Sequence, residues 1–154
     1  MKRHFVAVIS LFFLTSASAG DGLVSKKSGV GVEETLDRLE AVLEKKGITI
    51  FSRVSHTAGA EDAGIELRPT ELLIFGNPRL GSHFFTSRQT AGIDLPMKAL
   101  AWEDADGQVW LTYNDPAYLV RRHTISDRAP LVEKMRKVLS ELSAAATGSA
   151  AQVQ

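Results

Sequence analysis

Residues 71–78, Glu-Leu-Leu-Ile-Phe-Gly-Asn-Pro, constrain the fold more than any other part of the chain. The consecutive apolar side chains Leu72 to Phe75 predict a strand at the centre of a sheet, or one covered on both faces. Gly76, Asn77 and Pro78 then end the strand, because proline cannot donate a hydrogen bond to a neighbouring strand. The fold therefore has to contain a buried strand that runs directly into a sharp corner.

The amino-terminal residues have the pattern of a secretory signal peptide. Lys2 and Arg3 form a basic start, an apolar run extends from Phe5 to Leu14, and Ala17-Ser18-Ala19 supplies the small residues before a cleavage site. An apolar helix of about ten residues is only about 15 Å long, half of a bilayer core, so it is too short for a spanning anchor. We expect residues 1–19 to be cleaved after Ala19, leaving a periplasmic or secreted protein without a membrane anchor.

The remaining chain has the length of one domain, which we place at residues 20–146, followed by a small, polar and disordered tail at 147–154. It contains no Cys, which excludes disulfides, thiol catalysis and thiolate metal sites. Loss of Lys2 and Arg3 from the 18 basic residues leaves the 18 acidic ones in slight excess. The basic residues are also dispersed, so we expect no nucleic-acid partner.

Two segments have clear helical periodicity. Val32, Leu36, Leu39 and Leu43 form one apolar stripe that ends before Gly47. In a last helix that opens at Pro130, the predicted buried stripe is Leu131, Met135, Val138 and Leu142, with Val132 and Leu139 beside it. Shorter helices are predicted at 80–89 and from Pro116 to about Arg122, and 58–68 is predicted to be a loop that contains at most a helical turn.

Five segments have strand patterns: 23–28, 48–56, 71–75, 97–103 and 108–113. The order strand, helix, four strands, helices predicts an α+β fold: a two-layer sandwich in which a mostly antiparallel sheet carries its helices on one face. Phe51 and apolar residues of the later strands are assigned to the other face. Since that face would be apolar in a small domain, we expect a second copy to cover it, giving a homodimer.

With these segments placed, the chain resembles a bacterial family known as domain of unknown function 302. The motifs that carry the resemblance, spread over about Gly31 to Met135, are Glu34-Thr35, His56-Thr57-Ala58-Gly59-Ala60, 69–78 with its Phe-Gly-Asn-Pro, Gly92-Ile93-Asp94-Leu95-Pro96, Trp102-Glu103-Asp104 and Tyr113-Asn114-Asp115-Pro116. The resemblance implies a two-layer α/β fold similar to one repeat of the TATA-binding protein, often as a dimer. It implies no accepted activity.

Four polar residues at predicted strand ends and corners are candidates for a ligand site: His56, Asn77, Tyr113 and Asp115. His56 could act as an acid, a base or a ligand, or its ring could cap a loop carbonyl. Asn77 precedes a proline and could display its amide to a ligand, or satisfy its own loop. Tyr113 and Asp115 could join His56 in a polar cluster, or be a half-buried Tyr beside a helix cap.

Patterns for other chemistries are missing from the sequence. His56, His83 and His123 lie far apart, no nucleophile motif occurs, and no glycine loop has the order that cradles phosphates. We therefore predict no metal and no cofactor, and assign no catalytic residue.

Three hypotheses for the function follow. The first is an exported domain that binds a small ligand or a protein near His56, Asn77 and Tyr113. The alternative is an enzyme with His56 as general acid or base and Asn77 as oxyanion or substrate donor, which requires both side chains within about 3 Å of one point. A third is an assembly factor that acts through the second face of the sheet.

Overall fold

The computed structural model describes residues 22–148, and the predicted signal peptide lies outside them. Its elements, in chain order, are β1 (Leu23–Lys27), α1 (Val32–Lys45), β2 (Thr49–Ser55), α2 (His56–Asp62), β3 (Thr70–Gly76), α3 (Pro78–Ser87), the 3₁₀ helix η1 (Gln89–Ile93), β4 (Met97–Glu103), β5 (Val109–Asn114), α4 (Pro116–Arg122) and α5 (Ala129–Thr147).

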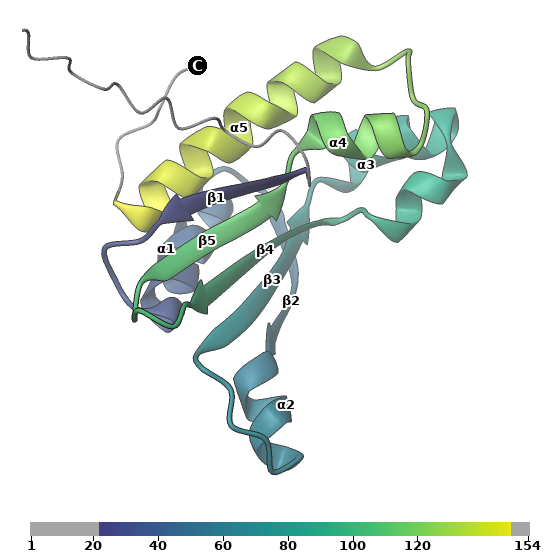
Figure 1. Ribbon diagram of the computed structural model, residues 1–154. Coiled ribbons are helices and arrows are strands. Elements are labelled where there is room, and N and C mark those ends of the chain that lie inside the picture. Colours follow the sequence, from purple (N-terminus) through teal and green to yellow (C-terminus); the bar gives the residue numbers. More distant parts are fainter. Residues whose placement is uncertain (1–21, 149–154) are drawn as a thin grey trace, which may run out of the picture.

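The five strands form one antiparallel sheet in the order β1-β5-β4-β3-β2 (Figure 1). Strand β3 pairs on both sides, as its apolar sequence predicts, whereas β1 and β2 are the two edges. Helix α1 joins these edges and packs with α5 on one face of the sheet. The predicted α+β fold, with its helices on one face of an antiparallel sheet, is confirmed.

The core lies between the sheet and helices α1 and α5. The predicted stripe of α1 is confirmed, because Val32, Leu36, Leu39 and Leu43 are all buried. On the three central strands, buried apolar side chains occupy alternate positions, as expected when one face is covered: Leu73 and Phe75 in β3, Met97, Ala99 and Ala101 in β4, and Val109, Leu111 and Tyr113 in β5.

The buried stripe predicted for α5 is wrong, because the helix is rotated about its own axis relative to the predicted orientation. Its buried residues are Val132, Leu139, Leu142 and a small-residue end that reaches Ala146 and Thr147. Leu131, Met135 and Val138 are only partly buried. The apolar arc of α5 is wide enough to face two surroundings, and periodicity alone does not say which side meets the sheet.

Several boundaries also differ from the prediction because of capping residues. Ser55 accepts a hydrogen bond from the Ala58 N–H and caps α2, which begins at His56, predicted to end a strand, and continues into the segment predicted to be a loop. Asn77 caps α3, which begins at Pro78 and not at residue 80. Helix α5 includes Thr147, the residue at which the tail was expected to start.

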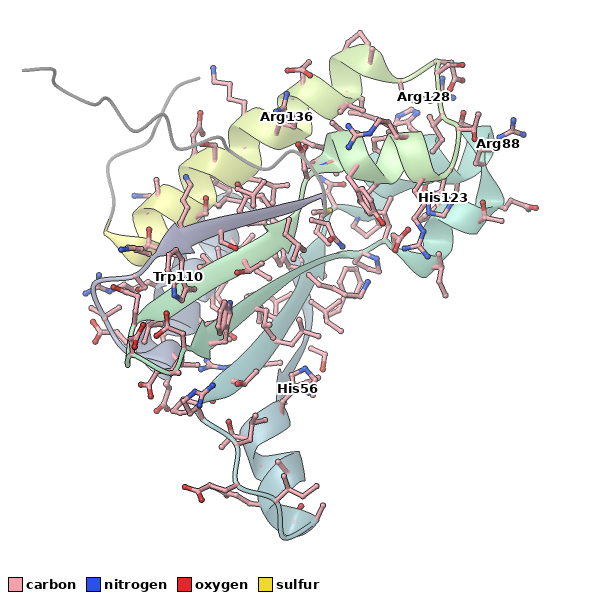
Figure 2. All side chains as sticks on the ribbon, in the orientation of Figure 1. His56, Arg88, Trp110, His123, Arg128 and Arg136 are labelled. Carbon is pink, nitrogen blue, oxygen red and sulfur yellow. The ribbon has the colours of Figure 1, made fainter. Side chains whose placement is uncertain are left out.

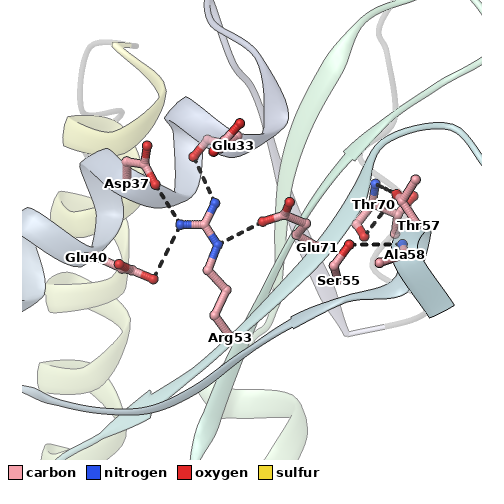
Figure 3. Close-up of polar contacts among 9 residues, drawn as sticks. All are labelled: Glu33, Asp37, Glu40, Arg53, Ser55, Thr57, Ala58, Thr70 and Glu71. Atoms are coloured by element: carbon pink, nitrogen blue, oxygen red, sulfur yellow. Dashed lines mark hydrogen bonds and ion pairs between the residues drawn. The ribbon is translucent and has the colours of Figure 1, made fainter.

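The charged side chain of Arg53 connects the sheet to α1. It donates hydrogen bonds to Asp37 at 2.6 Å, Glu71 at 2.8 Å and the Glu33 carbonyl at 3.2 Å, and lies 3.6 Å from Glu40 (Figure 3). Burial lowers the pKa of the Arg53 guanidinium, but its hydrogen bonds with Asp37 and Glu71 outweigh burial and raise the pKa overall. Arg53 therefore clamps the edge strand β2 to the helix layer.

We expect Arg53→Met to lower the free energy of unfolding by about 1–2 kcal/mol, because it leaves Asp37 and Glu71 without their shared donor. Urea denaturation followed by circular dichroism measures this loss. Arg38→Met is the matched control: Arg38 makes an exposed i,i+4 pair with Glu34, so its loss costs about 0.5 kcal/mol or less. Equal losses in the two variants would contradict the role of Arg53 as a clamp.

The opposite face of the sheet carries no helix in the part of the chain that the structure describes (Figure 1). Its centre is a half-exposed apolar stripe of Val54, Leu72, Ile74 and Leu100. Trp102 and Trp110 stack beside it with ring centroids 6.4 Å apart. Phe51 lies elsewhere than predicted: a bulge between Ile50 and Ser52 places it beside Gly76, at the end of the sheet.

Candidate functional site

A cavity of about 450 Å³ opens where the corner 75–78 meets helices α3 and α5. This volume is in the range of pockets that hold small molecules in proteins. The lining is mainly aliphatic and aromatic: Ile48, Phe51, Phe75, Gly76, Asn77, Pro78, Leu80, Gly81, Ser82, Phe84, Phe85, Leu95, Pro96, Met97, Lys134, Met135, Val138, Leu139 and Leu142.

The corner creates this cavity by directing α3 away from the end of the sheet. Phe75 is buried, and the chain then turns at Asn77, whose side-chain oxygen accepts hydrogen bonds from the Arg79 and Leu80 N–H groups at 3.0 and 3.3 Å. Pro78 occupies the first turn of α3, where no N–H is needed. The rotated face of α5, with Met135 and Val138, forms the opposite wall.

The lining contains three polar side chains. Ser82 donates its hydroxyl hydrogen to the Pro78 carbonyl at 2.8 Å, and the Asn77 oxygen is occupied by the cap of α3. The side chain of Lys134, which is exposed on α5, has no hydrogen bond or ion pair with any residue in the range 22–148. Its ammonium group is therefore available to a ligand at the mouth of the cavity.

His56 lies far from the other predicted site residues. It is exposed at the start of α2, where Figure 2 shows it at the end of the sheet opposite to His123. Strands β2 and β3 are antiparallel, so Ser55 pairs with Glu71 whereas Thr49 pairs with Gly76. The six residue steps from Thr49 to Ser55 separate His56 from Asn77 by about 20 Å.

Tyr113 and Asp115 lie at the same end of the sheet as Asn77 but serve the fold. Tyr113 is buried under α5; burial raises the pKa of its phenol, while a hydrogen bond with Ser143 acts in the opposite direction. Asp115 caps α4 through the Ala117 N–H and pairs with Arg136 at 3.1 Å. Neither residue lines the cavity.

The predicted cluster of His56, Asn77 and Tyr113 is therefore not formed within one chain. Of the four predicted residues, only Asn77 belongs to the cavity. The enzyme hypothesis required His56 and Asn77 to approach the same reacting atom, and the antiparallel pairing of β2 with β3 separates them.

A second group of polar residues was missed by the sequence analysis. His123 lies 2.5 Å from Asp94 and 3.1 Å from Thr90 through its two ring nitrogens, and Arg122 pairs with Asp94 at 3.2 Å. The residues come from η1, the segment after it and the end of α4, so no spacing in the sequence could have joined them. The cavity beside His123 measures about 10 Å³, barely the space of one water molecule, and the group acts as a clamp between η1 and α4.

In the range 22–148, no three His, Asp or Glu side chains gather where they could hold a metal ion. None of the helices in this range is both long enough and apolar enough to cross a membrane.

Comparison with known proteins places the fold in context. The family model described as "Domain of unknown function DUF302" matches residues 24–142. The crystal structure of an uncharacterized conserved DUF302 protein from Bacillus stearothermophilus is similar with a TM-score of 0.66 and 20% identity, over 84% of this chain and 98% of that one. At this identity the likeness concerns the fold alone.

Curated relatives match at higher identity over part of their length. The protein named fluoride-specific ion channel FluC 1 of Brucella suis biovar 1 (strain 1330) is 51% identical over 104 residues, covering 68% of this chain and 41% of that protein. FluC 2 of Brucella melitensis biotype 1 is also 51% identical over 104 residues, with 38% of its length covered. The chain thus spans about two fifths of the length of these relatives.

Proposed function

This chain belongs to the DUF302 family of domains of unknown function, and on that premise we propose that it binds a small, mainly apolar organic molecule in the cavity at the 75–78 corner. The observation that carries the proposal is the cavity itself. Its lining combines many apolar groups with a few polar ones, the usual composition of a ligand site.

The names of the curated relatives offer a different ligand, which the lining does not favour. Fluoride is a small, strongly hydrated anion, and its binding needs several donors to replace its water. The cavity offers mostly hydrocarbon and has room for a far larger molecule. For this chain we therefore propose an organic ligand, whatever the role of the matched segment in the proteins named FluC.

A titration with the neutral fluorescent dye N-phenyl-1-naphthylamine tests the proposal. We expect saturable binding of one dye molecule per chain, with the increase in emission that an apolar site produces. Small apolar ligands should displace the dye. Absence of saturable binding would contradict the proposal. Binding of several dye molecules per chain would also contradict it, because that result indicates adsorption to exposed apolar surface and not occupation of one site.

We also propose that the domain forms a homodimer through the open face of its sheet. The support is the half-exposed stripe of Val54, Leu72, Ile74 and Leu100, which continues into the Trp102–Trp110 pair. The two indole N–H groups are satisfied internally, by Thr112 and by Asp104, so the rings present hydrocarbon without an unmet donor. A two-fold axis over Leu72 would bring the same stripe of a second copy onto this one.

Leu72→Glu should convert the dimer to a monomer, because a carboxylate in the middle of an apolar interface has no partner. Light scattering coupled to size exclusion measures the mass, and circular dichroism verifies the fold. Ile65→Glu is the control, since Ile65 is 62% exposed in the loop before β3, away from the face. A monomeric parent protein, or an unchanged dimer in Leu72→Glu, would contradict this interface.

A further inference from the structure

We propose that the ligand of the cavity is a monocarboxylic acid with an unbranched or aromatic hydrocarbon body, and that Lys134 and the Asn77 amide bind its carboxylate. This inference rests on the proposed function, because it names the chemistry of the ligand for the same cavity. It follows from the charge of the lining, from the hydrogen bonds that its polar groups have already made, and from its apolar wall.

The charge of the lining has one sign. Among the described residues that line the cavity, Lys134 is the only ionisable one. The nearest acid along α5, Glu133, pairs with Arg136, and Arg136 pairs in turn with Asp115. The positive charge of Lys134 therefore has no counter-charge within residues 22–148, and an anionic ligand group would supply one.

The second polar group also favours an acceptor. Asn77 uses its side-chain oxygen for the Arg79 and Leu80 N–H groups, which identifies the other amide atom as the –NH₂. No described residue accepts from that –NH₂. Like the Lys134 ammonium, an amide –NH₂ donates only. Both of these lining groups can only donate, so a ligand that contacts either of them gains more from a carboxylate than from an ammonium group.

The rest of the ligand has to be hydrocarbon. The wall formed by Phe51, Phe84, Phe85 and the apolar residues of α5 offers no donor or acceptor from its side chains. A polar group placed there would lose its water without compensation. The cavity of about 450 Å³ accommodates a medium-length alkyl chain or an aromatic ring system.

Matched ligands test the proposal by isothermal titration calorimetry: decanoate, decanol and decylamine share one chain and differ in the head group. We expect decanoate to bind about fivefold to tenfold more tightly than decanol, since Lys134 is exposed and its charge is partly screened. Decylamine should bind more weakly than decanol. Added salt should reduce the preference for decanoate and leave decanol unaffected.

Lys134→Met removes the charge and keeps the length of the side chain. This change should lower the affinity for decanoate by about fivefold and leave the affinity for decanol unchanged. Lys137→Met is the control, because Lys137 is exposed on the same helix and does not line the cavity; it should leave the affinities of both ligands unchanged.

The outcomes separate this inference from the proposed function. Equal affinities for decanoate and decanol would overturn the carboxylate proposal and leave the cavity as an apolar site. Failure of all three ligands to bind, together with failure of the dye, would overturn the proposed function. A preference for decanoate that persists in Lys134→Met would overturn the assignment of Lys134.

Discussion

Leu73→Ala should lower the free energy of unfolding by about 2–5 kcal/mol. Leu73 has no exposed surface and lies in β3, which pairs on both sides and faces the helix layer. Removing its side chain leaves a void among buried groups that are fixed by two neighbouring strands. Urea denaturation followed by circular dichroism measures the change.

Leu72→Ala, one residue earlier in the same strand, is the control for this prediction. Leu72 lies on the open face and is only half-buried, so the same chemical change should cost about 1 kcal/mol in dilute, monomeric protein. Both variants keep the strand and lose the same atoms. The difference between their losses of stability therefore measures the effect of burial under the helices. A loss below about 1 kcal/mol for Leu73→Ala would contradict the assignment of the core.

The parts of the fold that the sequence predicted are those with a strong local pattern. The four-residue stripe of α1 predicted a helix and its buried face together, and the residues found in β4, Met97 to Glu103, are those expected. The continuous apolar run at 72–75 predicted a central strand or one covered on both faces, and β3 is central, with Leu73 and Phe75 under the helices and Leu72 and Ile74 on the open face. Local periodicity is sufficient wherever one face of an element meets one surface.

The prediction failed where an element meets two surfaces or begins with a cap. Helix α5 contacts the sheet with Leu139 and Leu142 but borders the cavity with Met135 and Val138, and its hydrophobic pattern does not distinguish the two. Helix α2 lacks a buried residue altogether, so no periodicity marked it, and its start depends on the Ser55 cap. Such features come from tertiary contacts and from single hydrogen bonds.

The candidate site was predictable only at the corner. Asn77 was identified because it precedes Pro78, and it does line the cavity, although its oxygen serves as a helix cap. His56 was grouped with it because each follows a strand, but neighbouring antiparallel strands run in opposite directions and finish at opposite ends of the sheet. Lys134 was missed, since a lysine on an exposed helix face carries no signal until the neighbouring wall is known.

Gly81→Met should strongly weaken ligand binding and leave the protein at least as stable as before. Gly81 lies within α3 and lines the cavity, and a Cβ there would meet only the ring of Phe85, at an ordinary contact distance of 3.6 Å. A methionine therefore enters space that the ligand would occupy. Replacing glycine inside a helix also contributes about 0.5–1 kcal/mol of stability. Affinity for N-phenyl-1-naphthylamine and for decanoate should fall by at least about tenfold.

Gly59→Ala distinguishes an effect on the cavity from a general effect of helix stabilisation. Gly59 lies inside α2, and a Cβ there would meet nothing within 4 Å. This variant should gain a similar stability of about 0.5–1 kcal/mol from helix propensity. It should bind both ligands with unchanged affinity. Undiminished binding in a folded Gly81→Met variant would remove the cavity from consideration. Loss of binding in both variants would mean that affinity depends on flexibility of the helices, because Gly59 is too far from the 75–78 corner to touch a ligand there.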